Sequence, residues 1–589
     1  MPKPPAPPRR PGALPTRRSI DELLAEGLRL HQSGRATEAA PLYRQVLDRM
    51  PDQPAANHLL GLVNLQQGKP EEAVRLISRA IRARGTDPQY FTNLGVALNQ
   101  LGRHAEALDA LDRALALNPR LPGALSNRGM AQKALGRHDD AARSYRAAIE
   151  LLPNEPGFHA NLGNALVEAG DLLAAEKAFR AAATLRPWHT NAVVGLCMVY
   201  EETNRVADAE ALARQAADAV PAESQFHYRL GRALGLLRRP DEALAAFRHA
   251  VHLKPDYGLA WCYLAESFRR DSEDDEVAAI RALAESTGID AEERTFASFA
   301  LGRSLADLDR HEESIAAFKA ANALRRQLSG ESAEAEIAGL RRRIEQFSVW
   351  PDSANGAGFD GMAPVFVVGL PRSGKTTVES MLAAGEGFAG VGEQRVMPRL
   401  VAAASAAHGD DLSRWPASAW VALGAAYAAQ VAPLVPPGYR PVDTLPPNFA
   451  LVGFILAALP RATIIHTSRS RPEHLVALFE KYISGAGYAY SAALADLLAY
   501  HAAYRDLMAT WHRLLPDVIT DVDVADVSSK ARILARLGLP ETLAAAPIET
   551  EPRVGEWSAD RIAANCRAHM SAWQAAHPEL FDEATAPVW

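Results

Sequence analysis

A glycine-rich stretch in the C-terminal half of the chain carries the residue types that bind phosphate. Gly369 is followed, after four residues, by Gly374, Lys375 and Thr376, which is the spacing Gly-x4-Gly-Lys-Thr. The apolar run 365–368 before it predicts a buried strand, and residues 376–384 after it predict a helix. Backbone N–H groups of such a loop surround phosphate oxygens, and the lysine ammonium neutralises their charge. The sequence therefore predicts a phosphate-binding loop between a strand and a helix.

The loop pattern alone leaves the phosphate ligand open. An ATPase or kinase usually adds an apolar strand that ends in aspartate and holds magnesium. The two best further strand candidates, residues 463–466 and 518–524, do not end in that way: the first continues into Thr467-Ser468-Arg469, and the second carries internal acids. The sequence therefore gives little support for an ATP-dependent enzyme, although the intact loop pattern keeps that function as an alternative.

The residues in and after the loop resemble one family. The loop also contains Pro371, Arg372, Ser373 and Thr377, and the pair Gly392-Glu393 follows about 20 residues later. This pattern resembles the 5′-phosphosulfate loop of sulfotransferases that use 3′-phosphoadenosine 5′-phosphosulfate (PAPS). The resemblance is closest to the bacterial tetratricopeptide–sulfotransferase family and the related tyrosylprotein sulfotransferases. Further similar stretches lie at residues 442–466, 487–491 and 535–540, so the similarity extends from residue 362 to the end.

The resemblance implies a set of roles. Sulfuryl transfer needs positive groups where charge accumulates on the leaving phosphate, and Arg372 and Lys375 can supply them. It also needs a base for the acceptor's hydroxyl proton, and the resemblance places Glu393 in that role; a solvated loop acid is the alternative. No metal is expected. The residues implied to bind PAPS are Gly369, Pro371, Arg372, Ser373, Gly374, Lys375, Thr376, Thr377 and Arg469.

Two departures from the family pattern concern cations. The family has Asp-Lys before the x-Pro of its second strand, where the lysine reaches the leaving group, but this chain has Asp443-Thr444-Leu445-Pro446. Conversely, Lys375 stands where the family usually has threonine. One cation is lost and one is gained, so we hypothesise that Lys375 compensates for the lysine missing at Thr444.

A third departure concerns the 3′-phosphate. The family uses an arginine and, eight residues later, a serine; aligned on Pro472, these positions are Ser470 and Leu478 here, and Arg469 and Arg471 flank the first. An arginine can still reach a phosphate from either side, but the serine hydroxyl is absent. Weakened PAPS affinity, a different donor or a non-catalytic relative are the alternatives that follow. Arg395 and Arg399 offer either an acidic-substrate site or surface ion pairs.

Alternating elements are predicted around the loop. Besides the three strands, helices are expected at 447–458, 472–483, 492–513, 529–537 and 558–574. This order predicts an α/β domain with a mainly parallel sheet, helices on both faces and the ligand at the carboxyl ends of the strands. We place this sulfotransferase-like domain at residues 363–589. A capping helix and a linker rich in Gly, Pro, Asp and Asn are placed at 331–362.

The part of the chain before this domain repeats every 34 residues. A small residue usually lies twelve positions before each repeated alanine, a turn residue five positions before it, and a large residue four positions after it. The repeated alanines are Ala39, Ala73, Ala107, Ala141, Ala175, Ala209 and Ala243. The pattern resembles the tetratricopeptide repeat and predicts an all-α superhelical solenoid over 20–330, with seven regular repeats followed by degenerate ones. Its concave surface can hold a protein or peptide acceptor; a spacer or dimerisation device is the alternative.

Composition bounds the remaining classes. A chain of 589 residues is too long for one core, and a net charge of −7 argues against a nucleic-acid partner. Three widely separated cysteines favour a reducing, cytoplasmic setting. No apolar run near 18 residues was identified, so no membrane span is expected. Residues 1–19, rich in Pro and Arg, predict a disordered leader without the apolar core of a secretory signal.

These patterns together favour one function over two others. We expect a multidomain enzyme that transfers a sulfuryl group from PAPS to a hydroxyl, with a tyrosine or another hydroxyl of a protein or peptide presented by the array. The first alternative is a scaffold protein whose loop domain has lost turnover, supported by Thr444 and Leu478. The second is a kinase or ATPase, supported only by the Gly-x4-Gly-Lys-Thr spacing.

Overall fold

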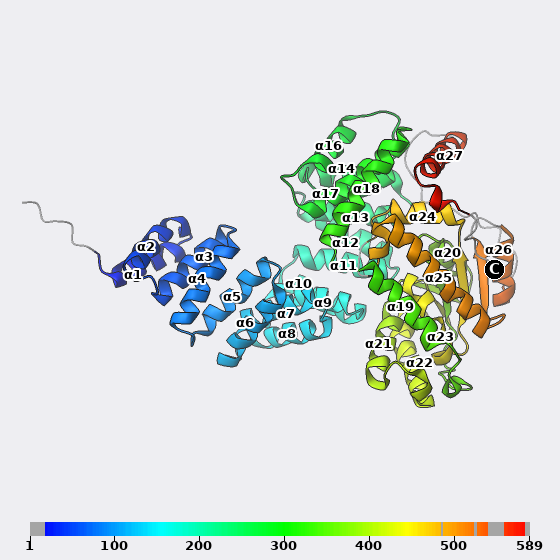
Figure 1. Cartoon of the computed structure of the whole chain (residues 1–589), viewed down its shortest axis with the longest axis horizontal. Coiled ribbons are helices and arrows are strands. Elements are labelled where there is room, and N and C mark those ends of the chain that lie inside the picture. The colour runs from blue at the N-terminus through cyan, green and yellow to red at the C-terminus, as the bar shows by residue number, and fades with distance from the viewer. Residues whose placement is uncertain (1–17, 331, 484–486, 524–526, 540–558, 583–589) are drawn as a thin grey trace, which may run out of the picture. The chain divides into compact units, whose positions relative to one another are not determined.

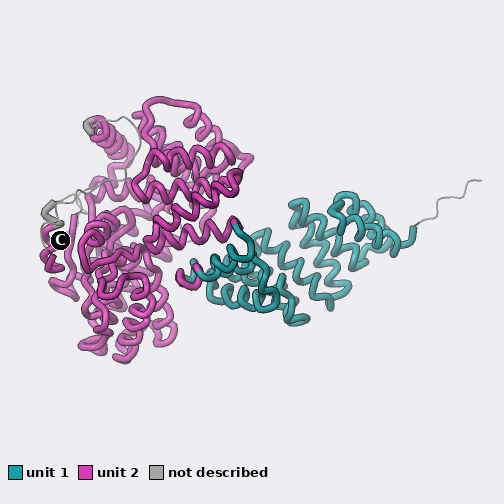
Figure 2. The backbone as a smooth tube through the Cα atoms, turned by 180° about the vertical axis from the view of Figure 1, so that it is seen from behind, with its two compact units in different colours: residues 1–169, 177–187 teal, residues 170–176, 188–589 magenta. Residues whose placement is uncertain are grey.

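A computed structural model describes residues 18–330, 332–483, 487–523, 527–539 and 559–582. The chain divides into two compact units, residues 1–169 with 177–187 and residues 170–176 with 188–589 (Figure 2). The predicted leader lies outside the described residues except for residues 18 and 19. Ser19 caps the first helix, because its hydroxyl accepts a hydrogen bond from the backbone N–H of Glu22 at 3.1 Å.

Helices pair into hairpins from residue 20 onward (Figure 1), and the first helices of successive hairpins begin 34 residues apart. The hairpins are α1 (Ile20–Gln32) with α2 (Ala36–Arg49), α3 (Pro54–Gln66) with α4 (Pro70–Ala83), α5 (Pro88–Gln100) with α6 (His104–Leu117), α7 (Pro122–Ala134) with α8 (His138–Leu151), α9 (Pro156–Glu168) with α10 (Leu172–Leu185), α11 (Thr190–Glu202) with α12 (Val206–Ala219) and α13 (Ser224–Leu236) with α14 (Pro240–Leu253). These seven hairpins match the seven predicted repeats.

Six of the seven hairpins close through one repeated contact; in the sixth, α11 with α12, the two positions are Cys197 and Ala213. In the first, a Cβ on Gly27 would lie 2.5 Å from the ring of Tyr43, and in the fifth a Cβ on Gly163 would lie 2.5 Å from the ring of Phe179. The large residue of the second helix therefore packs on the small residue of the first helix in the same repeat. The turn residue takes left-handed backbone geometry, as Gly34 does at φ +80°.

The degenerate region continues the helical pattern with altered lengths. It contains α15 (Gly258–Ser267), α16 (Asp275–Glu285), α17 (Ala291–Asp307) and α18 (His311–Leu328), followed by α19 (Ala333–Gln346). Helix α19 lies in the segment predicted to hold a capping helix, and it packs along α25 (Leu494–Leu514) within the second unit (Figure 1). The later repeats therefore share a compact unit with the C-terminal domain.

The C-terminal domain is built on a sheet of five parallel strands in the order β2-β3-β1-β4-β5. The strands are β1 (Val365–Val368), β2 (Phe388–Gly392), β3 (Arg440–Asp443), β4 (Thr463–Ser468) and β5 (Ile519–Asp523). The sequence predicted β1, β4 and β5. It missed β2 and β3, because FAGVG is rich in glycine and RPVD is short and contains proline, and neither reads as a strand locally.

Helices cover both faces of this sheet, as predicted. On one face, Val365 and Ile465 share a core with Val378 of α20 and Ile533 of α26. On the other face, Phe366 packs against Tyr427 of α22. The helices are α20 (Lys375–Ala383), α21 (Val396–His408), α22 (Ala417–Val431), α23 (Val452–Ala458), α24 (Arg471–Phe479), α26 (Val527–Leu537) and α27 (Ala559–Ala576), with α25 given above. Helices α21 and α22 were not predicted from the sequence, and α24 ends four residues before its predicted end.

One segment corrects the expectation about apolar runs. Residues Ala417–Leu434 are long and apolar enough to cross a membrane, with a mean hydropathy of 1.2, although 39% of this stretch is buried inside the structure. Trp420 and Tyr427 of this segment are fully buried against Phe454 and Phe366. The core helix of an α/β domain satisfies the same length and composition criteria, so the match is weak support for a membrane span.

Candidate functional site

The glycine-rich loop, residues 369–375, joins β1 to α20 with backbone geometry suited to anions. Gly369, Arg372 and Gly374 have φ angles of +146°, +66° and +96°. A Cβ on Gly369 would lie 2.5 Å from the carbonyl oxygen of Thr467, so only glycine fits there. Left-handed residues alternating with right-handed ones turn successive N–H groups inward to form an anion-binding nest, and the N-terminus of α20 adds its dipole.

Two neighbouring elements hold this loop in place. The hydroxyl of Ser373, which is fully buried, lies 2.7 Å from the hydroxyl of Thr467 at the end of β4. The Nε2 atom of His474, on α24, lies 2.8 Å from the carbonyl oxygen of Pro371. Burial lowers the pKa of His474 to about 4, so the ring is neutral and donates its Nε2–H to that carbonyl. The loop is therefore anchored from the sheet and from a helix, while Arg372 and Thr376 remain exposed.

Lys375 is a buried cation at the centre of the loop. Its ammonium donates to the carbonyl oxygen of Leu370 at 2.9 Å, and the residue is 5% exposed. Burial lowers the pKa of Lys375 to about 8; the charge of Arg372 acts in the same direction and that of Glu393 opposes it. A bound phosphate would favour the charged form of Lys375, so the loop can bind an anion and respond to its charge.

Glu393 follows directly after β2 and reaches the same end of the sheet. The pairing of β2 with β3 shifts by one residue between Gly390 and Gly392, and Gly392 has a φ of +69°. Such a bulge redirects the chain and the side chain that follows it. Desolvation raises the pKa of Glu393, against the opposing charges of Lys375 and Arg395, although the side chain itself remains accessible to solvent. A carboxylate that is accessible to solvent and lies near a cation of the loop can accept a proton.

Behind Glu393 lies a second acid that the sequence analysis did not single out. Glu379, on α20, accepts hydrogen bonds from the backbone N–H of Gly392 at 2.9 Å and from the hydroxyl of Thr444 at 3.3 Å. Burial raises its pKa to about 7. Thr444, which stands where the family has lysine, is therefore a buried hydrogen-bond donor to Glu379 and carries no charge toward the loop.

The structure corrects one step in the argument against ATP. Strand β3, next to β1, does end in an aspartate, Asp443. One of its carboxylate oxygens accepts the hydroxyl of Tyr427 at 2.9 Å, and the other accepts the side-chain amide of Asn448 at 3.0 Å and the N–H of Leu445 at 3.1 Å. Asp443 is fully buried, and burial raises its pKa to about 7. The Asp443 carboxylate therefore serves as a structural hydrogen-bond acceptor and is not oriented to bind magnesium.

The residues expected at the 3′-phosphate are only partly brought together. The guanidinium of Arg469 lies near the loop, 3.4 Å from the carbonyl oxygen of Arg372, and is exposed. Arg471 turns away and donates to the carbonyl oxygen of Asp582 at 2.6 Å. Leu478 is fully buried in the core of the domain. Arg469 is therefore the cation of this pair that a nucleotide on the loop can reach.

The later repeats contribute charged groups on the same side as the loop. Glu266 of α15 forms an ion pair with Lys481, which follows α24. Burial opposes ionisation of Glu266, yet the positive charges of Lys481, Arg372 and Arg303 hold its pKa below the usual range. Glu266, a residue of the repeat array, therefore interacts electrostatically with Arg372 within the second unit.

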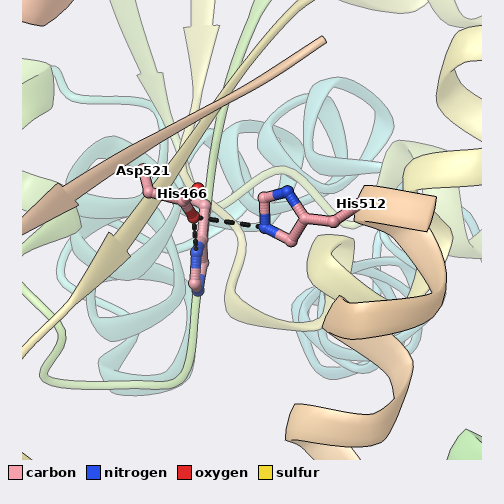
Figure 3. Close-up of side chains that lie close together, drawn as sticks. All are labelled: His466, His512 and Asp521. Atoms are coloured by element: carbon pink, nitrogen blue, oxygen red, sulfur yellow. Dashed lines mark hydrogen bonds and ion pairs between the residues drawn. The ribbon is translucent and has the colours of Figure 1, made fainter. Parts of the chain in front are cut away.

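A further polar cluster joins β4, β5 and α25 (Figure 3). His466 Nδ1 lies 2.6 Å from the carboxylate of Asp521 on the neighbouring strand, and His512 Nε2 lies 3.4 Å from the same oxygen. Among the described residues these three form a group that could hold a metal ion, because their ligand atoms lie within 4.8 Å of one another. However, the Nε2 atom of His466 also bonds the hydroxyl of Tyr504, so both of its ring nitrogens already have partners.

Comparison with known proteins agrees with the two modules and their folds. Residues 364–542 match the model of the sulfotransferase family, and tetratricopeptide-repeat models match residues 30–95, 88–121, 127–187, 166–234 and 224–257. The chain joins tetratricopeptide repeats to a sulfotransferase-family domain. The predicted order of the two modules is confirmed, and so is the fold class of an all-α solenoid followed by an α/β domain with a parallel sheet.

Individual relatives are more distant. A curated protein of Aquifex aeolicus, described as uncharacterized, is 25% identical over 372 residues, which cover 60% of this chain and 48% of that protein. The chain thus spans about half the length of this relative. Two solved structures are also similar. A tetratricopeptide repeat protein from Parabacteroides merdae has 18% identity and a TM-score of 0.36, and the match covers 42% of this chain and 97% of that one. PilF of Pseudomonas aeruginosa has 18% identity and a TM-score of 0.32, and the match covers 35% of this chain and 94% of that one.

The structure gathers the predicted loop residues, Glu393 and Arg469 at the carboxyl ends of β1, β2 and β4. Sequence reasoning missed Glu379 and His474, which hold the segment before Glu393 and the loop, and it missed the buried roles of Asp443 and Glu266. No local signal marks them, because a glutamate or histidine on a helix is ordinary, and Asp443 was noted only as part of a family pattern. Their roles depend on contacts between segments distant in sequence.

Proposed function

We propose that this protein transfers a sulfuryl group from PAPS to a hydroxyl acceptor. The observation that carries the proposal is the placement of Glu393 within electrostatic reach of Lys375, whose loop also bears Arg372, in a domain that matches the sulfotransferase family. The cations suit the departing phosphate, and the carboxylate suits the acceptor's proton.

The residues divide the reaction between them. The acceptor oxygen forms a bond to sulfur while the bond between sulfur and the bridging oxygen of the 5′-phosphate breaks. Lys375, Arg372 and the loop amides stabilise the negative charge that then collects on 3′,5′-adenosine bisphosphate. Glu393 accepts the proton of the acceptor hydroxyl. In this proposal Lys375 replaces the lysine that the family carries at the position of Thr444, and Arg469 contacts the 3′-phosphate.

We propose a protein or peptide as the acceptor, with tyrosine or another hydroxyl as the modified group. Tetratricopeptide repeats generally bind proteins, and the later repeats of this chain share a compact unit with the transferase domain. Charged side chains of that part of the array, Glu266 among them, lie close to the loop cations. We place the protein in a reducing, cytoplasmic setting, since Cys197, Cys262 and Cys566 are all free thiols.

A kinase or ATPase is the second candidate, because the loop carries Gly-Lys-Thr. Thermal-shift titration separates the candidates. Stabilisation by 3′,5′-adenosine bisphosphate without an effect of ATP–magnesium supports sulfuryl transfer, and the reverse pattern supports the kinase. No response to either nucleotide supports a scaffold protein.

A transfer assay completes the test. Purified protein is incubated with PAPS and a panel of hydroxyl-bearing peptides, and the release of 3′,5′-adenosine bisphosphate is measured together with the mass increase of the peptide. Glu393→Gln is the matched variant, because it keeps the size of the side chain and removes the base. Release that persists in this variant would contradict the assigned role of Glu393.

A further inference from the structure

The segment that carries Glu393, residues 391–395, is held from two sides. On the sheet side, the N–H of Gly392 donates to Glu379 at 2.9 Å, and its carbonyl oxygen accepts the N–H of Thr444 at 3.1 Å. Both backbone groups of Gly392 are thereby fixed to the transferase domain. These bonds position the start of the segment but do not involve Glu393 or the residues after it.

On the other side, the segment meets the repeat array. The side-chain amide of Gln394 donates to the carbonyl oxygen of Glu202 at 3.1 Å and to that of Val391 at 2.5 Å. Glu202 is the last residue of α11, so this hydrogen bond joins Gln394 to the C-terminal end of that helix. Gln394 is 2% exposed, so water does not readily replace this amide.

The backbones approach each other closely at the same place. A Cβ on Gly392 would lie 2.7 Å from the carbonyl oxygen of Glu202, and Gly392 has a φ of +69° that side chains disfavour. The end of α11 therefore packs directly on the segment that precedes Glu393. All of these residues belong to the second compact unit.

We propose that Gln394 is a positioning residue through which the tetratricopeptide helix α11 fixes the orientation of Glu393. The inference rests on the proposed function, in which Glu393 is the base, and it gives the array a role besides holding an acceptor. Without the Gln394 amide, the segment keeps its hydrogen bonds at Gly392 and its packing on the array, but it loses the hydrogen bond that ties Gln394 to α11. Glu393, between the two, then samples positions away from the acceptor oxygen.

This role predicts a separation of kinetic effects. The glycine-rich loop is anchored by other residues, Thr467 and His474, so PAPS binding does not depend on Gln394. Gln394→Leu, which keeps the approximate volume and removes the donor, should lower kcat by roughly 10–100-fold and leave KM for PAPS within about twofold. Gln394→Ala is the second variant, because its smaller side chain lets water reach the Glu202 carbonyl if the leucine variant folds poorly.

A matched control is available in the fourth repeat. Gln132 of α7 is also a buried glutamine, and its side chain accepts a hydrogen bond from Ser144 at 2.6 Å. Gln132→Leu removes a buried amide from the array without touching the transferase domain's segment 391–395. Its kcat should match that of the unchanged protein.

A second readout is independent of transfer. Hydrogen exchange of peptides covering residues 388–396 should become about tenfold faster in Gln394→Leu and stay unchanged in Gln132→Leu. Unchanged exchange and kcat in both Gln394 variants would overturn the proposal, and so would a parallel loss of kcat, PAPS affinity and melting temperature. If the unchanged protein releases no 3′,5′-adenosine bisphosphate, the proposed function fails, while the exchange experiment still decides whether Gln394 ties the segment to the array.

Discussion

Replacing Glu379 by glutamine should stabilise the protein at alkaline pH and leave it nearly unchanged in acid. Glu379 is buried behind Glu393, and burial raises its pKa from 4.5 to about 7. The folded protein therefore holds a proton at Glu379 that the unfolded chain has already released between these pH values. Stability is then greatest below the unfolded pKa and decreases as pH rises toward the folded pKa.

The size of the effect follows from the two pKa values. Ionising Glu379 in the folded protein costs about 3 kcal/mol more than in the unfolded chain, as an upper value, because 1.4 kcal/mol corresponds to one pKa unit. The neighbouring acids Glu393 and Asp443 share part of this cost. Glutamine keeps the acceptor for the Gly392 N–H, and its amide can donate to the Thr444 hydroxyl. Glu379→Gln should therefore gain about 1–3 kcal/mol at about pH 8.

The assay is thermal unfolding of both proteins without nucleotide, from about pH 5 to about pH 8.5, read as the difference in melting temperature. The difference should be near zero in acid and grow to a few degrees in favour of the variant. Glu38→Gln is the control, since Glu38 is exposed and its hydrogen bond from Arg35 lowers its pKa. A difference for Glu379→Gln that is constant with pH, or that favours the unchanged protein at high pH, would refute the reasoning.

Four further predictions concern single residues. Lys375→Ala should lower transfer about 100-fold or more while 3′,5′-adenosine bisphosphate still raises the melting temperature; unchanged turnover would show that Lys375 does not compensate for the missing lysine. Glu393→Gln should lower kcat by about 10²–10⁴-fold, and kcat of the unchanged protein should fall as pH drops through the raised pKa of Glu393; a flat profile would argue against this base. Leu478→Ser should cost about 2–4 kcal/mol in unfolding free energy without tightening nucleotide binding, because the side chain is fully buried. Burial opposes ionisation of Asp521, but hydrogen bonds with His466 and His512 hold its pKa well below the usual range. Asp521→Asn should therefore lower the melting temperature at neutral pH, and this loss should shrink on acidification. An equal loss at every pH would contradict the ion pair.

The repeats and the loop were predictable because their signals are local. A 34-residue period is repeated seven times, and each glycine, alanine and aromatic position has one steric reason. Strand β1, the loop and α20 form one continuous segment, so apolar run, glycine spacing and helix can be recognised together. The same method missed β2 and β3, whose residues favour turns. Strand β3 pairs with β1 and β2 pairs with β3, and the covering helices provide a buried face, which outweighs local preference.

The sequence by itself determined the two modules, their order, and the loop whose backbone suits a phosphate. It also supplied Glu393 and Arg469 as candidates through a resemblance. Only the tertiary structure decided which groups meet. Asp443 becomes a buried hydrogen-bond acceptor, Leu478 packs in the core, and Gln394 donates to the end of helix α11. The physical reason is distance along the chain. Periodicity and loop spacing are fixed by neighbouring residues, whereas burial, pKa and positioning arise where segments separated by up to about two hundred residues pack together.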